Sequence, residues 1–389
     1  MMKKIVNFVK KETVLTVSWI LAISSMFLIK PDSRYISYID FKTLASLWSL
    51  MLVVAAFTDL GTFDRIARKM LAKTKYIWQL VSLLVLLPFA FSMFITNDVA
   101  LLTFVPFSIH IIQMSKRDEL IIPVVCYQTV AANLGSMLTP IGNPQNIYLF
   151  SLSDMTVAEF ITLVLPYICV SILLLMAGII SIKGKRGLVL TSDSFETTDK
   201  NFNPTDESEQ QNNNSKKYEL IYLILFIMAV LAVAFPKIIK YPIVVLVILL
   251  VCLLINRKML VSIDYALLFT FVGFFIFTGN LERIGNVREF LISLVNGHEV
   301  LAAILSSQLI SNVPAALLLS NFTNKIPDLI IGVNLGGLGT LIASMASLIS
   351  FKLLAHRRNE LKGKYLLYFT LVNIIFLTIL FFFYQNYAS

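Results

Sequence analysis

Apolar stretches of roughly 17 to 25 residues, the length that a helix needs to cross about 30 Å of hydrocarbon, recur along this chain. The 389 residues are 57% hydrophobic and only 14% charged, and the mean hydropathy is +0.80. Such a chain lacks the polar surface that a soluble protein needs. The sequence therefore predicts an all-α polytopic membrane protein.

These stretches give the expected crossings. The first stretch follows several lysines, is long for a secretory signal and lacks a clear small-x-small cleavage site, so we expect an uncleaved first span. The predicted crossings are 13–29, 41–60, 119–152, 157–182, 218–235, 240–255, 263–281, 326–352 and 364–386.

Two other apolar stretches are interrupted near their middles. Residues 77–114 are broken by TND at 96–98, and residues 299–324 by SNVP at 311–314. Each resembles a re-entrant helical hairpin that enters and leaves the membrane on one side. With both hairpins and a cytoplasmic N-terminus, most of the 32 Lys and Arg residues fall in cytoplasmic loops and the C-terminus lies outside. Reading either hairpin as a full crossing removes this charge bias.

A long polar segment divides the chain. Residues 183–217 show no apolar period and predict a disordered cytoplasmic linker. The halves 1–182 and 236–389, separated by a connecting span at 218–235, carry three landmarks in the same order. These are FTDLGTFDRIARKML, TNDVALL and ANLGSMLTPIGNPQN, then FTGNLERIGNVREFL, SNVPAALLL and VNLGGLGTLIASMAS. Because the extra span reverses the second half, we expect an inverted-topology repeat.

The hairpin tips and the two predicted broken spans locate a binding site. Unpaired backbone groups persist at membrane depth only around a hydrated site, where helix N-termini favour an anion and freed carbonyls can hold Na⁺. The predicted site residues are small, polar or helix-breaking: Thr96, Asn97, Asp98, Asn133, Gly135, Ser136, Thr139, Pro140, Gly142, Asn143, Asn146, Ser311, Asn312, Pro314, Asn334, Gly336 and Thr340.

Some of these residues have a plain structural interpretation as well. Glycine and small residues also serve close helix packing in membranes. Asp98 is the one carboxylate that we place deep in the membrane, where a charge must be protonated, paired or ion-bound, so it is the candidate coupling group. It could equally cap the helix that follows.

Other function classes find little support in the residues. The net charge of +9 comes from short basic runs between spans, so no nucleic-acid partner is expected. Cys126, Cys169 and Cys252 fall inside apolar spans without ligand spacing, which argues against disulfides and metal. GxSxG, GxGD, HExxH and P-loop motifs are absent from the sequence, so we expect neither a hydrolase nor ATP coupling within the chain. A separate ATPase partner and a nontransporting receptor stay open, although a receptor would not need two matched breaks.

These motifs resemble those of the ion transporter superfamily that includes the citrate and divalent anion/sodium symporters and the arsenite pump membrane subunits. SMLTPIGNPQN is similar to the Thr-Pro-x-Gly-x-Pro-x-Asn run of that group. Its symporters carry Ser-Asn-Thr at both tips, and this chain keeps the asparagines, Asn97 and Asn312, but not the third residue. NDVA and NVP resemble the arsenite and citrate-type branch. The second break lacks prolines, which departs from the symporters' second sodium site.

The resemblance implies an elevator-type secondary transporter, usually a homodimer. We expect it in the plasma membrane, with no cofactor other than Na⁺ or H⁺ as coupling ion. The cargo would be a small anion, a di- or tricarboxylate or an inorganic oxyanion, with ligands among Asn97, Thr139, Asn143, Asn146 and Asn312. Asn97, Thr139 and Asn143 would also suit Na⁺. A sodium/proton antiporter that uses Asp98 and an arsenite-type permease remain as alternatives on the same fold.

Overall fold

The computed structural model describes residues 12–182 and 209–387, with side chains from residue 216 onward in the second range. Both ranges are helical throughout, without a strand between the described residues. Seven helices among them are long and apolar enough to cross a membrane, and α16 and α17, bent by 110°, form an eighth candidate. The chain is therefore a multi-pass membrane protein.

The first half begins with α2 (Thr13–Leu28), the short α3 (Tyr35–Tyr38) and α4 (Phe41–Asp59). The amphipathic α5 (Thr62–Leu71) then leads into a helical hairpin of α6 (Ile77–Phe91) and α7 (Asn97–Met114). The rest of this half consists of η1 (Asp118–Leu120), α8 (Ile121–Gly135), η2 (Ser136–Leu138), α9 (Pro144–Leu152) and α10 (Val157–Ser181).

The second half repeats this order after α12 (Glu209–Ala234). It comprises α13 (Tyr241–Ile255), α14 (Met259–Ser262), α15 (Tyr265–Glu282), α16 (Gly285–Val295), α17 (Glu299–Ile310), α18 (Asn312–Leu319), η3 (Ser320–Phe322), α19 (Ile326–Gly336), α20 (Met345–Arg357), η4 (Asn359–Leu361) and α21 (Lys362–Tyr387). α17 and α18 form the second helical hairpin.

Both predicted broken spans are interrupted. The helix of 119–152 stops after η2 and resumes at α9, so residues 139–143 form the first break. The helix of 326–352 stops with α19 and resumes at α20, so residues 337–344 form the second break. The depth of the two hairpins in the membrane, and hence their re-entrant and inverted topology, stays a prediction of the charge pattern.

One boundary differs from the expectation. α12 begins at Glu209, so residues 209–217, assigned to the linker from the sequence, are helical. Once an apolar helix exists, extending it into polar flanking sequence adds one hydrogen bond for each residue fixed. The remainder of the predicted linker, 183–208, lies outside the described residues.

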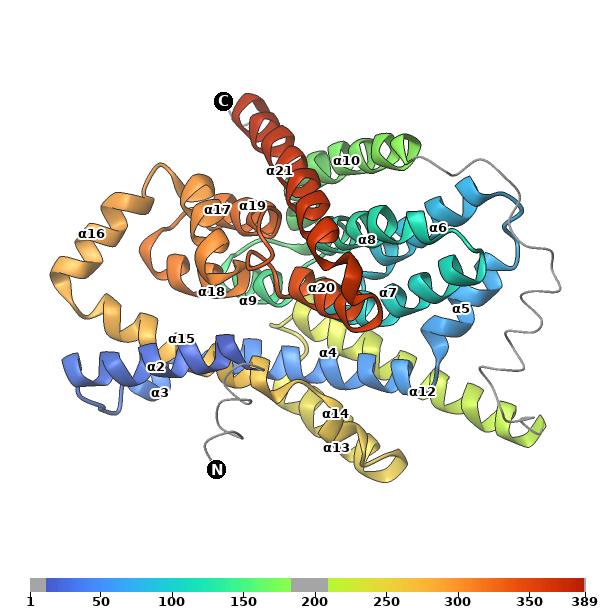
Figure 1. The fold of residues 1–389 in the computed structure, drawn as a ribbon. Helices are drawn as coiled ribbons and strands as arrows, with labels where there is room; N and C mark the ends of the chain where they lie inside the picture. The colour runs from blue at the N-terminus through green and yellow to red at the C-terminus, as the bar shows by residue number, and fades with distance from the viewer. Residues whose placement is uncertain (1–11, 183–208, 388–389) are drawn as a thin grey trace, which may run out of the picture.

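The helices form two groups (Figure 1). In one, α2 packs on α15, and α4 packs on α12 and α13. In the other, the first hairpin packs on α8 and, through α7, on α20, while the second hairpin packs on α19 and, through α18, on α9. The two breaks are therefore surrounded by both hairpins.

Corresponding helices in the first group start in the same way. Asp40 accepts a hydrogen bond from the Thr43 N–H at 3.1 Å and caps α4. Asp264 accepts one from the Leu267 N–H at 3.0 Å and caps α15. An N-cap carboxylate satisfies one of the free N–H groups at a helix start and favours the dipole. The side chain of Asp264 also reaches the cavity described below.

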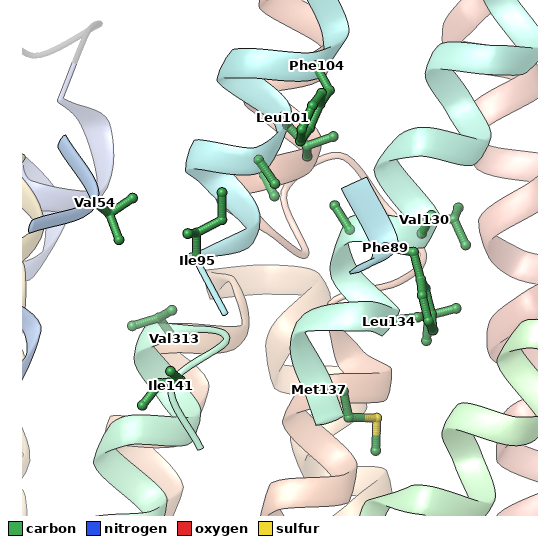
Figure 2. Packing of buried hydrophobic residues seen from close by; sticks show 14 of the residues in the cluster. Val54, Phe89, Ile95, Leu101, Phe104, Val130, Leu134, Met137, Ile141 and Val313 are labelled. Atoms are coloured by element: carbon green, nitrogen blue, oxygen red, sulfur yellow. The ribbon is translucent and has the colours of Figure 1, made fainter. Parts of the chain in front are cut away.

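Apolar side chains seal the region around the first break (Figure 2). Ile95 precedes α7, Ile141 lies within the break and Val313 lies at the start of α18, and all three are buried in the main hydrophobic cluster. Phe89 of α6 and Leu134 of α8 belong to the same cluster. The polar groups of the first break are thus largely enclosed by apolar packing, which makes their hydrogen-bond partners important for stability.

Candidate functional site

The tip of the first hairpin is tied to the first break. The N–H of Asn97, the first residue of α7, donates to the Gly142 carbonyl oxygen at 3.3 Å. From the break, Thr139 Oγ1 donates to the Met93 carbonyl oxygen in the turn that joins α6 to α7, at 2.5 Å. The predicted residues Thr96, Asn97, Thr139 and Gly142 therefore lie at one place, where two chain segments satisfy each other's backbone groups.

The start of α9 follows the predicted helix-breaking pattern. Pro140 is buried inside the break. Asn143 caps α9 by accepting a hydrogen bond from the Asn146 N–H at 2.9 Å, and Pro144 occupies the first turn, where its missing N–H costs nothing. Asn143 Nδ2 also donates to Ser136 Oγ at 3.2 Å. Asn143 therefore links the two sides of the break.

The tip of the second hairpin is tied to the second break in the same way. The Asn312 N–H donates to the Ala343 carbonyl oxygen at 3.0 Å. Here a single residue, Ser311, joins α17 to α18, with φ 75° and ψ 154°. This region of backbone space is one that glycine alone adopts without strain. Pro314 falls in the first turn of α18, where proline is tolerated.

The two breaks bond each other reciprocally. The stretches 133–146 and 334–347 align without a gap, which pairs Asn133 with Asn334, Asn143 with Ser344 and Asn146 with Ser347. Asn334 Oδ1 accepts from Asn143 Nδ2 at 3.0 Å, and Asn334 Nδ2 donates to Asn146 Oδ1 at 2.7 Å. Each asparagine thus belongs to a network that crosses between the halves.

The counterpart network has the same pattern. Asn133 Oδ1 accepts from Ser344 Oγ at 3.1 Å, and Asn133 Nδ2 lies 3.4 Å from Ser347 Oγ. Asn133 Oδ1 also accepts from Asn97 Nδ2 at 3.0 Å, which brings the hairpin tip into the network. All these side chains are buried. Five of the predicted site residues are therefore brought together: Asn97, Asn133, Asn143, Asn146 and Asn334.

The predicted glycines serve close backbone approach. A Cβ atom on Gly135 would lie 2.1 Å from the Phe89 carbonyl oxygen of α6, and one on Gly142 would lie 2.1 Å from the Ser136 carbonyl oxygen. A Cβ atom on Gly336 would lie 2.5 Å from Ser307 Oγ of α17. These three positions support the packing interpretation of the glycines.

A cavity of about 830 Å³ lies beside the first hairpin. Its lining includes residues from the starts of four helices: Thr96 and Asp98 at α7, Pro144 at α9, Asp264 at α15 and Met345 at α20. The helix dipole makes such ends partly positive, although Asn143 already caps α9 and Asp264 already caps α15. The lining includes none of the residues 311–314 of the described second tip. The cavity therefore reaches one hairpin tip and not the other.

The same cavity carries charges of both signs. Arg68, His110 and Arg357 line it together with the carboxylates Asp59 and Asp64. The two arginines act electrostatically on His110, so the three basic groups share one region. Burial raises the pKa of the Asp64 carboxyl, and the Arg68 guanidinium lowers it in part. None of the three basic groups stood among the residues predicted for the site.

Asp98 is a half-buried carboxylate of this cavity. Among the described residues, its Oδ1 atom is buried without a hydrogen-bond partner, and so is Thr103 Oγ1, five residues further along α7. The Asp264 carboxylate lies close enough to repel a charge on Asp98. Asp98 lies in the first turn of α7, where a negative charge suits the helix dipole, but Thr96 is the N-cap residue and no side chain caps this helix start. The structure therefore does not show the hydrogen-bonded cap of the structural interpretation.

Two polar residues that shape the site were missed from the sequence. Gln308 of α17 bonds the backbone of the second break through both atoms of its amide, including the Thr340 N–H at 2.9 Å. Glu299, which is buried, accepts from the Gly297 N–H and from Thr323 Oγ1 at the base of the second hairpin. The contacts of Gln308 with Thr340 and of Glu299 with Thr323 join residues 32 and 24 positions apart, and a pattern read along the chain gives no signal for either.

Comparison with known proteins places the chain. The model of a family described as citrate transporter matches residues 5–327. An uncharacterized transporter of Methanocaldococcus jannaschii is 33% identical over 345 residues, 88% of each chain. The inner membrane protein YbiR of Escherichia coli is 31% identical over 328 residues, 82% of each chain. The human P protein is 30% identical over 120 residues, 31% of this chain and 14% of that protein. The chain belongs to the citrate transporter family, and it is a transporter rather than an enzyme.

Proposed function

We propose that this protein is a secondary transporter that moves a small anion, a di- or tricarboxylate or an inorganic oxyanion. Its transport would be driven by a Na⁺ or H⁺ gradient. The observation that carries the proposal is the meeting of four helix starts, those of α7, α9, α15 and α20, at one cavity. Helix N-termini bind anions through free N–H groups and the dipole. The match to citrate transporters favours a carboxylate cargo.

The coupling ion would act at Asp98. An anion that enters the cavity beside two carboxylates, Asp98 and Asp264, meets repulsion unless one charge is neutralised. A proton or a cation on Asp98 removes that repulsion and gives its unpartnered Oδ1 atom a partner. Binding of the anion and of the coupling ion would thus favour each other, which is the requirement for symport.

The amide network would fix the positions of the two breaks next to the cavity, whose lining includes Pro144 and Met345 directly after them. The side chains of Asn143 and Asn334 bond each other. Their role would therefore be to position the two breaks, and less to bind the anion directly. We expect the hairpins and broken spans to move together past the first helix group, in an elevator motion, within a homodimer. The protein would sit in the plasma membrane with its N-terminus in the cytoplasm.

The sodium/proton antiporter remains a second candidate because of one observation. Asp98 and Asp264 line the same cavity, and a pair of carboxylates can exchange Na⁺ and H⁺ without any anion. The arsenite-type permease has no such specific support in the structure, and we keep it as a variant of the oxyanion case.

Thermal stability of the detergent-purified protein tests the proposal, because a ligand stabilises the state that it binds. The panel contains citrate, succinate, phosphate and arsenite, each with and without Na⁺ and at several pH values. We expect one anion to raise the melting temperature, and Asn97→Ala to remove that rise. Stabilisation by Na⁺ or pH alone, with no response to any anion, would decide for the antiporter.

A further inference from the structure

Each break leaves carbonyl groups without helical partners, and in each case they converge on one side-chain amide. In the first break, Asn146 Nδ2 lies 3.1 to 3.4 Å from the carbonyl oxygens of Ser136, Met137 and Thr139. Asn146 belongs to α9, which begins at the end of that break. Backbone carbonyls enclosed by protein need such a donor, or a cation in its place.

The second break uses a residue from another helix. Gln308 of α17 places its Nε2 atom 3.0 Å from the Gly336 carbonyl oxygen, 2.9 Å from that of Leu338 and 3.2 Å from that of Ile304. An NH₂ group has two hydrogens, so three acceptors around it exceed what it can bond well. Proteins also place several carbonyl oxygens around a cation, where these oxygens replace its hydration shell. Here the hydrogens of the amide NH₂ group, which carry partial positive charge, occupy the corresponding place.

The residues of the second break leave room for the Gln308 amide and bond its oxygen atom. Its Oε1 atom accepts from the Thr340 N–H at 2.9 Å. Gly339 has φ 109°, and a Cβ atom there would lie 2.3 Å from Gln308 Oε1, so a side chain at this position would displace the amide. Every polar atom of the Gln308 side chain is therefore used on the second break, which has none of the prolines of the first.

We propose that the Gln308 amide is a built-in substitute for a cation, which holds the carbonyl groups of the second break so that this break needs no bound Na⁺ or K⁺. The first break is served in the same way by Asn146. The coupling ion then has to act elsewhere in the molecule. This inference concerns the backbone of the breaks and holds for any cargo, so its test uses no transported anion.

The test compares melting temperatures of the full-length protein in choline, sodium and potassium chloride at one ionic strength. We expect Gln308→Ala to melt several degrees lower than the unchanged protein in choline, and to recover part of that loss, saturably, in Na⁺ or K⁺. A cation that enters the vacated carbonyl cage stabilises the folded state by mass action.

Two further variants make the result specific. Gln308→Glu keeps an acceptor for the Thr340 N–H but turns a negative oxygen toward the carbonyls, so we expect a larger loss in choline and a larger recovery by cations. Gln128→Ala is the control, because the Gln128 amide likewise donates to a backbone carbonyl, that of Leu84, outside both breaks. Its melting temperature should respond to cations as the unchanged protein does.

Two outcomes would overturn the inference. If both Gln308 variants lose stability equally in all three salts, Gln308 is an ordinary capping residue. If the unchanged protein shows a saturable cation response that Gln308→Ala abolishes, Gln308 belongs to a cation site instead of replacing one. Neither outcome bears on whether an anion is transported, which the anion panel decides separately.

Discussion

Asn143 Nδ2 in the first break donates a hydrogen bond of 3.0 Å to Asn334 Oδ1, which lies in the helix that leads into the second break. The residues are almost two hundred positions apart in the sequence, and both are buried. The same asparagine, Asn334, donates onward to Asn146 at 2.7 Å. The two halves of the chain therefore share one polar network at the place where both helices are interrupted.

Removing the shared residue should destabilise the protein. We expect Asn334→Ala to lower the free energy of unfolding by about 1–3 kcal/mol, because two buried partners lose their hydrogen bonds. Asn143→Ala and the double variant complete a cycle, whose coupling energy should be clearly different from zero. Asn373→Ala is the control, since Asn373 is also buried but, within the described part of the chain, its side chain bonds only the Phe369 carbonyl oxygen of its own helix. A coupling energy of zero would contradict a shared network.

Asp98→Asn should separate stability from coupling. Replacing a half-buried carboxylate, whose buried Oδ1 atom has no hydrogen-bond partner among the described residues, by a neutral amide should leave the melting temperature unchanged or raise it. The same variant should lose the dependence of anion binding on Na⁺ or pH, because the group that is neutralised has gone. Binding isotherms at several pH values, with and without Na⁺, measure this. An unaltered ion dependence would remove Asp98 from the coupling role.

Strain at the second hairpin tip predicts a stabilising substitution. Ser311 adopts φ 75° and ψ 154°, which costs a residue with a side chain about 1–3 kcal/mol. Ser311→Gly should therefore stabilise the protein by about 1 kcal/mol after the entropy cost of glycine. Ser311→Ala keeps the strain and should show no such gain. Equal melting temperatures of the two variants would show that the tip is relaxed.

Close approach of α6 and α8 gives a prediction of opposite sign. Gly135→Ala should cost about 1–3 kcal/mol, because the added methyl group meets the Phe89 carbonyl oxygen at 2.1 Å and the backbones must separate. Gly285→Ala is the matched control, since a Cβ atom there meets nothing within 4 Å at the start of α16. In thermal unfolding, Gly135→Ala should melt at a clearly lower temperature than Gly285→Ala. Similar melting temperatures would contradict the tight contact.

The pH dependence of stability should include a contribution from Asp64 at the cavity. Burial raises its pKa in the folded protein above the unfolded value, so folding favours the protonated form. As pH rises from the pKa of Asp64 in the unfolded protein to its pKa in the folded protein, this carboxyl lowers the free energy of unfolding. The decrease is complete above the folded pKa. Asp64→Asn should flatten the stability curve in that acidic window. An unchanged curve would show that Arg68 fully offsets the burial.

Much of this architecture could be predicted from local signals. The run TPIGNPQN predicts a broken span, and the helix stops at Leu138 and resumes with α9 at Pro144. TND at 96–98 and SNVP at 311–314 predict hairpin tips, and α7 and α18 begin at the asparagines. These signals work because a helix start is decided by a few neighbouring residues.

Contacts between distant segments could not be predicted. Gln308 lies inside α17, where glutamine is an ordinary helix residue, and only the fold places its amide on the second break. Glu299 opens the same helix, is buried, and accepts a hydrogen bond from Thr323, which follows the hairpin. Likewise, Arg68 and Arg357 share a cavity although almost three hundred positions separate them. Such relations depend on how distant helices pack, and local patterns in a single sequence do not reveal this packing.

Uptake into liposomes tests the central claim most directly. The purified protein is reconstituted, and accumulation of labelled citrate, succinate, phosphate and arsenite is followed under an imposed Na⁺ gradient or pH gradient. We predict accumulation of one anion that needs one of the two gradients, lost in Asn97→Ala and uncoupled from the gradient in Asp98→Asn. Gradient-driven exchange of Na⁺ for H⁺ with no uptake of any anion would contradict the account.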